Sequence, residues 1–439
     1  MEGGNLAVDL AKYGLGTRIH DIHDIHDAVK SSATQNFNPN NKTQMPGPLE
    51  GVKVLDLTTV VMGPFATQIL AELGADVIKI ESHEGDNMRH PGPMKNPGMG
   101  YMFLGLNRGK RGIVLDLKKP EGREALLRLV VQADVLIYNV RPQAMARLGL
   151  SYEDVSELNP RLLYVGAYGY SQKGPYAAKA AYDDLIQGIS GVPWLVAQTG
   201  ASPNYAPVNL ADRLTGLHAV YTVTAALFQR SRTGRGQSIE VPMFESVTHF
   251  VLGDHIAGFT WDPAHGEGGY QRLLARKPYP TSDGYLCVLV YNDKQWKSFL
   301  GAIGRPELMQ DPRYATQASR AANIRDIYAF LTGLFKTRTT AQWMALLESV
   351  DIPVARMNSV EDVVNDPHLS QSGFFTTEEH PSEGSLRAMR TPTNWSESQP
   401  GTPRPAPRLG EHSAEILREA GYSDSEIADL VAKGVTKLL

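Results

Sequence analysis

The sequence of 439 residues predicts an α/β fold built on a doubly wound parallel sheet. Short apolar, β-branched segments alternate with segments of helical periodicity across residues 52–169. This alternation is typical of βαβ units with right-handed crossovers. Between about 245 and 350 the pattern changes to a mixture of helices and strands, which indicates a second, smaller α+β domain.

The first βαβ unit spans residues 52–80. VKVLDL (52–57) predicts a buried strand, a helical segment follows Gly63-Pro64 and ends at Gly74, and DVIKI (76–80) predicts the second strand. Pro120 favours the start of a helix over 120–133. The further strands of this region are expected at 112–117, 134–140 and 161–169. Neither a P-loop nor G-x-G-x-x-G follows the first strand, so the fold class does not imply ATP or NAD.

The second half of the chain begins with one long helix from Asp212, which the glycines at 234 and 236 should end. The Pro-rich stretch 396–410 predicts an extended linker before a final amphipathic helix pair at 411–436. The elements expected between them are strands at 284–291 and 352–357 and helices at 294–302 and about 321–350.

Composition excludes several classes of protein. The formal net charge is −4, with 21% charged and 42% hydrophobic residues, which argues against a nucleic-acid-binding protein and against a disordered chain. The single cysteine, Cys287, excludes an intrachain disulfide framework and a Cys-based zinc cluster, and it favours a reducing, cytoplasmic compartment. No run approaches 18 apolar residues, so we expect no membrane span.

Residues 1–46 read as a flexible arm before a fold that begins near Gly47. They repeat Ile-His-Asp three times at 19–27, with histidines at 20, 23 and 26. That spacing allows a metal site on one face of a helix, but the polar composition favours a solvated arm, and we expect no metal. The arm lacks the basic and apolar regions of a secretory signal.

Asp212, at the start of the long helix, is the first candidate for chemistry. It has two interpretations: an N-cap residue, or a carboxylate that attacks an acyl group beside the helix amides. Serine, zinc and thiol hydrolases are disfavoured, because G-x-S-x-G is absent, the histidines beyond the arm lack metal-ligand spacing, and Cys287 falls in a predicted apolar strand.

Three further segments are candidate sites. The cations of Asn107–Arg111, with Lys118, would receive phosphates or form a solvated turn. Asn139–Pro142, with Arg147, lies at the carboxyl end of a predicted strand, where doubly wound sheets bind ligands. The loop Gly266–Gly269 would act as a lid or be a plain surface loop.

An ordered set of motifs from Gly47 to the C-terminus resembles family III CoA-transferases, the group that includes formyl-CoA transferase and carnitine CoA-transferase. These motifs are GPLEGVKVLDLTTVVMGPFATQILAELGADVIKIE, NRGKRGIVLDLKKPEGREALLRLVVQADVLIYNVRP, AYDDLIQGISG, NLADRLTGLHA, TGRGQSIEVPMFES, YPTSDGYLCV, DPHLSQSGFF and LGEH. Their order along the chain makes the resemblance specific.

The resemblance implies a Rossmann-like large domain made from both ends of the chain. In this sequence that domain would comprise 47–235 and the return segment 351–439, with the small domain inserted at 245–350. It also implies that two chains interlock as a homodimer.

The resemblance further implies a mechanism in which Asp212 is the nucleophile. Its carboxylate would attack the thioester of an acyl-CoA donor to give a mixed anhydride, then form an aspartyl-CoA thioester, from which a carboxylic acid takes the CoA. Gly268 and Gly269 approximately match the family's glycine loop, which would keep water from the intermediates. No permanently bound cofactor is implied, since CoA enters as part of the substrate.

The family's CoA contacts also fall on this chain, residue by residue. They are Val61, Met62, Leu115, Lys118, Asn139, Val140, Arg141, Arg147 and Tyr182. Two departures stand out, because formyl-CoA transferase has glutamine at the place of Val61 and arginine at that of Ser82. The adenosine 3′-phosphate would then be held by another cation, such as Arg89 or Arg108.

Two alternatives of other classes stay open at this stage. α-Methylacyl-CoA racemases share the fold but need a histidine where this chain has Tyr182. A catalytically silent CoA-binding subunit would not need Asp212. For a transferase, Val61 permits a bulkier acyl group, and the cations Arg272, Arg276 and Lys277 suggest a dicarboxylate or aromatic acid as acceptor, with succinyl-CoA or acetyl-CoA as donor.

Overall fold

The computed structural model describes residues 47–401 and 403–439, and of Arg272 only the backbone. The histidines of the Ile-His-Asp repeat lie outside the described residues. No helix in the described part of the chain is long and apolar enough to cross a bilayer.

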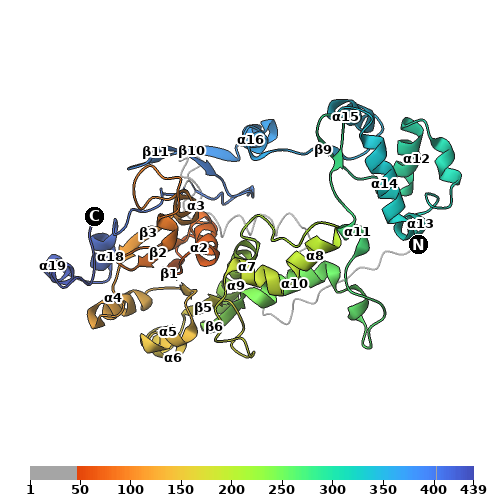
Figure 1. Cartoon of the computed structure of the whole chain (residues 1–439). Coiled ribbons are helices and arrows are strands. Elements are labelled where there is room, and N and C mark those ends of the chain that lie inside the picture. Colours follow the sequence, from red (N-terminus) through yellow and green to blue (C-terminus); the bar gives the residue numbers. More distant parts are fainter. Residues whose placement is uncertain (1–46, 402) are drawn as a thin grey trace, which may run out of the picture. The chain divides into compact units, whose positions relative to one another are not determined.

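Six parallel strands form the central sheet (Figure 1). They are β1 (Lys53–Leu57), β2 (Asp76–Glu81), β3 (Arg111–Val114), β4 (Val135–Tyr138), β5 (Leu163–Tyr168) and β6 (Gln237–Pro242). Their order is β3-β2-β1-β4-β5-β6, the order of a Rossmann sheet. The order reverses between β1 and β4, so the expected ligand crevice lies at the carboxyl ends of these two strands.

Both faces of the sheet are buried, which is why its central strands read as continuous apolar runs. On one face, Val54 of β1, Val77 of β2 and Ile137 of β4 lie in one core with α2 (Met62–Glu72), α9 (Leu210–Thr233) and α10 (Met243–His255). Leu55 faces the other way, toward α4 (Pro120–Val130) and the C-terminal helices α18 (Ser413–Glu419) and α19 (Asp424–Ala432).

The C-terminal segment is tied to β3 by specific contacts. Arg111 pairs with Glu415 and Glu419 of α18, and the Thr436 hydroxyl donates to the Val114 carbonyl over 2.6 Å. Leu417 and Leu430 are buried in the same core as β3. The larger core is therefore assembled from both ends of the described chain.

A second core surrounds a three-stranded antiparallel sheet, in the order β7-β8-β9. Its strands are β7 (Tyr279–Pro280), β8 (Tyr285–Val288) and β9 (Val354–Arg356), and its main helices are α12 (Asp293–Ala302), α14 (Ile324–Phe335) and α15 (Thr340–Glu348). This core differs in extent from the expected 245–350, because β9 pairs with β8 and because α10 packs on the larger core.

Several elements differ from expectation. The helix expected over about 321–350 is two helices, α14 and α15, and β3 ends at Val114 rather than 117. The edge strand β6 and the hairpin of β10 (Phe375–His380) and β11 (Gly384–Met389) were not predicted. The remaining helices are η2 (Asn87–Arg89), α3 (Tyr101–Asn107), α5 (Pro142–Arg147), α6 (Tyr152–Leu158), α7 (Asp183–Ile189), α8 (Val192–Gln198), η3 (Ala257–Thr260), α11 (Gln271–Leu274), η4 (Pro306–Gln310), α13 (Gln317–Ala322), α16 (Val360–Val364) and α17 (Pro367–Gln371).

Candidate active site

The turn between β1 and α2 lies at the point where the strand order reverses. Asn139, which directly follows β4, is bonded to this turn twice. Its side-chain oxygen accepts from the Thr59 amide over 3.0 Å, and its side-chain nitrogen donates to the Thr59 carbonyl over 2.7 Å. Two predicted CoA-contact segments, 61–62 and 139–141, are thereby brought together at the carboxyl edge. The Val61 and Met62 side chains are buried, so their backbone is what this edge offers to a ligand.

Asp212 lies in the first turn of α9 but does not cap it. The helix begins at Leu210 after the N-cap residue Asn209, so the expectation of an N-cap Asp212 is wrong. Instead, the Asp183 carboxylate accepts from the Asp212 backbone amide over 2.9 Å. The Gln187 side chain holds the other Asp183 oxygen over 2.6 Å. The carboxylate of Asp212 is thus left without a capping role.

Gly216 allows the start of α9 to pack closely against the start of α2. A Cβ at this position would lie 2.8 Å from the Met62 carbonyl, so only glycine permits the close approach. Asp212 and Gly216 are four residues apart and share one face of the helix. Arg213, the residue after Asp212, stacks on the Phe65 ring of α2, 4.4 Å from its centre. The half-buried Asp212 is therefore held beside the turn that follows β1.

The electrostatic surroundings of Asp212 disfavour its charge. Burial and the neighbouring Asp183 carboxylate raise the pKa of Asp212 to about 7, against the opposing effect of Arg213. Tyr182, the residue before Asp183, is 69% exposed at the start of α7. A carboxylate with a raised pKa beside a ligand-binding edge is typical of a functional group.

The cation cluster 107–111 does not form a phosphate site. Lys110 is fully buried and pairs with Asp56 over 2.9 Å, Arg108 pairs with Glu72, and Arg111 pairs with Asp76 and α18. Arg89, the other suggested phosphate ligand, is equally unavailable, because it is buried and makes two bonds to Glu81 of 2.6 and 2.8 Å. Both suggestions for the 3′-phosphate, Arg89 and Arg108, are therefore contradicted.

Other predicted cations remain open to solvent. Lys118, Arg141 and Arg147 are exposed and form no ion pair within the described residues. Lys118 and Arg141 follow β3 and β4 at the carboxyl edge, and Arg147 ends α5. Val140 is exposed there too, whereas the side chain of Leu115 is buried in the core. Arg276 and Lys277 are exposed beyond α11.

The glycine loop is an ordered loop attached to the end of α10. The Gly269 amide donates to the His255 carbonyl, and the Gly258 amide donates to the Glu267 carbonyl, both over 2.9 Å. A Cβ on Gly268 would lie 2.8 Å from the Phe259 ring. No hydrogen bond among the described residues joins Gly268 or Gly269 to the first turn of α9.

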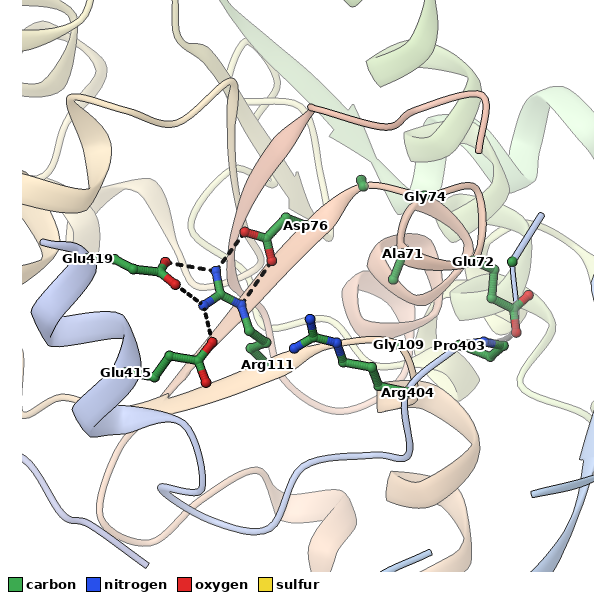
Figure 2. A pocket seen from close by; sticks show the side chains of 12 residues that line it. Ala71, Glu72, Gly74, Asp76, Gly109, Arg111, Pro403, Arg404, Glu415 and Glu419 are labelled. Atoms are coloured by element: carbon green, nitrogen blue, oxygen red, sulfur yellow. Dashed lines mark hydrogen bonds and ion pairs between the residues drawn. The ribbon is translucent and has the colours of Figure 1, made fainter. Parts of the chain in front are cut away.

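A cavity of about 440 Å³ lies at the opposite, amino edge of the sheet. Figure 2 shows Arg111 within it, held by Asp76, Glu415 and Glu419, with Arg404 nearby. Asp76 and Arg111 are the first residues of their strands, so this cavity is remote from the carboxyl ends where doubly wound folds bind ligands. No cluster of potential metal ligands was found among the residues described.

The combination of a Rossmann-order sheet with a carboxylate at its carboxyl edge defines the class of a ligand-binding α/β enzyme. Comparison with known proteins makes this specific. The model of CoA-transferase family III matches residues 49–413. Human succinyl-CoA:glutarate CoA-transferase is 32% identical over 398 residues, which cover 88% of this chain and 90% of that protein. Formyl-CoA:oxalate CoA-transferase of Escherichia coli O6:H1 is 33% identical over 411 residues, 88% and 98% of the two chains.

A solved structure agrees with these relatives. The CAIB/BAIF family protein from Brucella suis superposes with a TM-score of 0.74 at 33% identity, over 86% of this chain and all of that one. The protein belongs to CoA-transferase family III. It is a CoA-transferase, whose substrates are CoA thioesters and carboxylic acids.

Asp183 was not singled out from the sequence. Its only signal is an acidic doublet, Asp183-Asp184, before a short helical segment, and acidic residues at helix starts are common. Its role depends on a contact with residue 212, 29 positions along the chain.

Proposed function

We propose that this enzyme moves CoA from an acyl-CoA donor to a free carboxylic acid through covalent intermediates on Asp212. The observation that carries the proposal is the position of its carboxylate. The carboxylate is half-buried, plays no part in capping, and lies on the face of α9 that Gly216 presses against the start of α2.

The proposed steps conserve atoms and charge. The Asp212 carboxylate attacks the donor thioester carbonyl, CoA leaves as thiolate, and a mixed anhydride remains. The thiolate attacks the aspartyl carbonyl, which releases the donor acid and leaves an aspartyl-CoA thioester. The acceptor carboxylate then repeats both steps in reverse and departs as the new acyl-CoA. Amides in the first turns of α2 and α9 would stabilise the negative charge that develops on oxygen.

The exposed cations at the carboxyl edge support binding of the CoA phosphates. We assign this role to Lys118, Arg141 and Arg147 in place of the buried Arg89 and Arg108. Guanidinium and ammonium groups without carboxylate partners are free to form charge-assisted bonds with phosphate. The backbone at Val61 and Met62, with Asn139 and Tyr182, would border the pantetheine.

The rate should depend on the ionisation of Asp212. Only the carboxylate attacks, and its pKa is raised to about 7, so kcat/KM should fall as the pH decreases through about 7 and level off above it. Asp183→Asn removes the negative neighbour and should therefore lower the pH at which kcat/KM falls. The measurement is kcat/KM from pH 5.5 to 9 for both proteins. Identical acid limbs in the two proteins would exclude this electrostatic coupling.

A dicarboxylate is the acceptor that the chain's features favour. The exposed Arg276 and Lys277 follow the glycine loop, where they would receive a second carboxylate. The names of two relatives, succinyl-CoA:glutarate and formyl-CoA:oxalate CoA-transferase, also contain dicarboxylates.

A panel of acids tests this choice. With succinyl-CoA as donor, C4–C6 dicarboxylates should give the highest kcat/KM by mass spectrometry of the product thioesters, with aromatic acids as the second choice. The chain-matched monocarboxylates serve as controls. A strict preference for formate would contradict the assignment.

We also propose that two copies form an interlocked homodimer through helices α7 to α10. These helices carry large apolar side chains that are exposed in the single chain. They are Leu185, Ile189, Trp194, Leu217, Tyr221, Phe228, Phe250 and Leu252. Many exposed apolar side chains on consecutive helices favour burial against another protein, and the family resemblance supports a second copy as the partner.

A further inference from the structure

Three buried ion pairs lie beneath the carboxyl edge of the sheet, next to the turn between β1 and α2. They are Asp56–Lys110, Lys79–Asp86 and Glu81–Arg89, with distances of 2.9, 2.9 and 2.6 Å. All six side chains are at most 2% exposed. Burial of so many charges is costly and can exceed the gain from pairing, so stability alone does not explain the network.

The network binds the backbone of the turn at Thr58 and Val60. Asp56 accepts from the Thr58 amide over 2.9 Å, and the Lys79 ammonium donates to the Thr58 carbonyl over 2.9 Å. Asp86 accepts from the Val60 amide over 3.1 Å, while its other oxygen pairs with Lys79. Together with the two bonds from Asn139 to residue 59, these contacts leave the turn little freedom.

Val60 is held in a conformation that valine disfavours. Its φ is +72°, in the left-handed region, where a β-branched side chain is a rare outlier. Backbone strain of this kind persists only when the surrounding structure imposes it, and it is found most often at functional sites. The residue directly after it, Val61, begins the segment that we expect to contact CoA.

We propose that Asp86, neutralised by Lys79, is a positioning residue that imposes this turn and thereby sets the CoA-binding edge. The inference rests on the proposed function, because it assumes that CoA lies against residues 61–62. Asp86 does not touch the substrate. Its effect passes through the bond to the Val60 amide, and through that bond to the amides at the start of α2.

The test compares Asp86→Asn with a matched control. Asn keeps the size of the side chain and an acceptor for Val60, but it cannot neutralise Lys79. Asp134→Asn is the control, since Asp134 also pairs with an arginine (Arg230, 2.7 Å) and accepts a backbone amide, but at the amino edge of the sheet. We expect Asp86→Asn to raise the Kd for CoA, measured by calorimetry, about tenfold, or 1.4 kcal/mol. The KM for the acyl-CoA should rise in parallel and that for the acid should not, and Asp134→Asn should change neither.

Val60→Gly separates positioning from a structural role. Glycine adopts positive φ readily, so the turn no longer depends on the network. The single variant should bind CoA within about twofold of wild type, and Asp86→Asn combined with Val60→Gly should recover most of the lost affinity. A merely structural defect would not be rescued in this way, because Val60→Gly restores no buried charge.

Val60→Pro provides the test if Asp86→Asn does not fold. Proline fixes φ near −65° and removes the amide that Asp86 accepts, while all six charged side chains remain. CoA affinity should fall at least about tenfold in a protein with an unchanged circular dichroism spectrum. Wild-type affinity in Val60→Pro, or in folded Asp86→Asn, would overturn the inference, as would a double variant that shows no recovery.

The experiment also distinguishes this inference from the proposed function. If wild-type protein binds CoA and the Asp86→Asn and Val60→Pro variants bind it equally well, only the positioning role is wrong. If wild-type protein binds no CoA at all, the proposed CoA edge is wrong and the positioning role is excluded with it.

Discussion

Asp212→Asn is expected to abolish CoA transfer, with kcat lower by about 10³-fold or more, as for other enzymes that lose a nucleophile. The carboxamide has nearly the same shape as the carboxylate but cannot form the mixed anhydride. CoA itself should still bind, because its proposed contacts come from the β1–α2 turn and the segment after β4. Steady-state transfer from succinyl-CoA to a dicarboxylate, with CoA binding by calorimetry, measures both properties.

Loss of the fold is not expected in this variant. Burial and Asp183 raise the pKa of Asp212, which means that its charged form is less favourable in the folded chain than in the unfolded chain. Above pH 7 the uncharged Asn should therefore leave the thermal midpoint unchanged or raise it. Asp184→Asn, an exposed aspartate of α7, is the matched control and should keep full activity. Normal turnover by Asp212→Asn would contradict the proposed nucleophile.

Charge introduced among the exposed apolar side chains of α9 is expected to split the proposed homodimer. Phe228 is 66% exposed, and burying such a side chain at an interface contributes about 1.5–3 kcal/mol. Phe228→Glu removes that gain and places an unpaired carboxylate in the contact twice, because a two-fold interface contains each residue from both copies. Transfer activity should be lost together with the dimer.

Light scattering at micromolar concentration measures this prediction. Wild-type protein should have twice the 48.1 kDa mass of one chain, and Phe228→Glu should have the mass of one chain or aggregate. Val131→Glu is the control, since Val131 is 56% exposed but lies just after α4, on the other side of the sheet. A folded, monomeric wild-type protein would contradict the homodimer.

The central strands could be predicted from sequence because burial on both faces gives them an unbroken apolar pattern. The five expected strands of the parallel sheet correspond to β1–β5 within a few residues. The sixth, β6 (QSIEVP), was missed because it is an edge strand with alternating exposure and three charged or polar residues in its first four. Its place depends on pairing with β5, 74 residues earlier at Leu163↔Gln237, which no local pattern reveals.

The site was only partly predictable for a related reason. Local sequence identifies cations but not their partners. Lys110 resembled a phosphate ligand, yet its carboxylate partner Asp56 lies 54 residues away in β1. The exposed Lys118 and Arg147 were indistinguishable from it by composition. Likewise, the N-cap interpretation of Asp212 was wrong by three residues because helix starts depend on which side chain reaches the free amides, and here Asp183 of another helix does so.

Oxygen-isotope transfer tests the covalent mechanism most directly. The enzyme is incubated with an acyl-CoA donor and an acceptor acid whose carboxylate carries ¹⁸O, and the peptide that contains Asp212 is analysed by mass spectrometry. In the proposed steps the bridging oxygen of the second anhydride comes from the acceptor and stays on the aspartate when the new acyl-CoA departs. One ¹⁸O should therefore appear in the Asp212 carboxylate after a single turnover. Acyl-CoA product formed with no label in that carboxylate would contradict the mechanism.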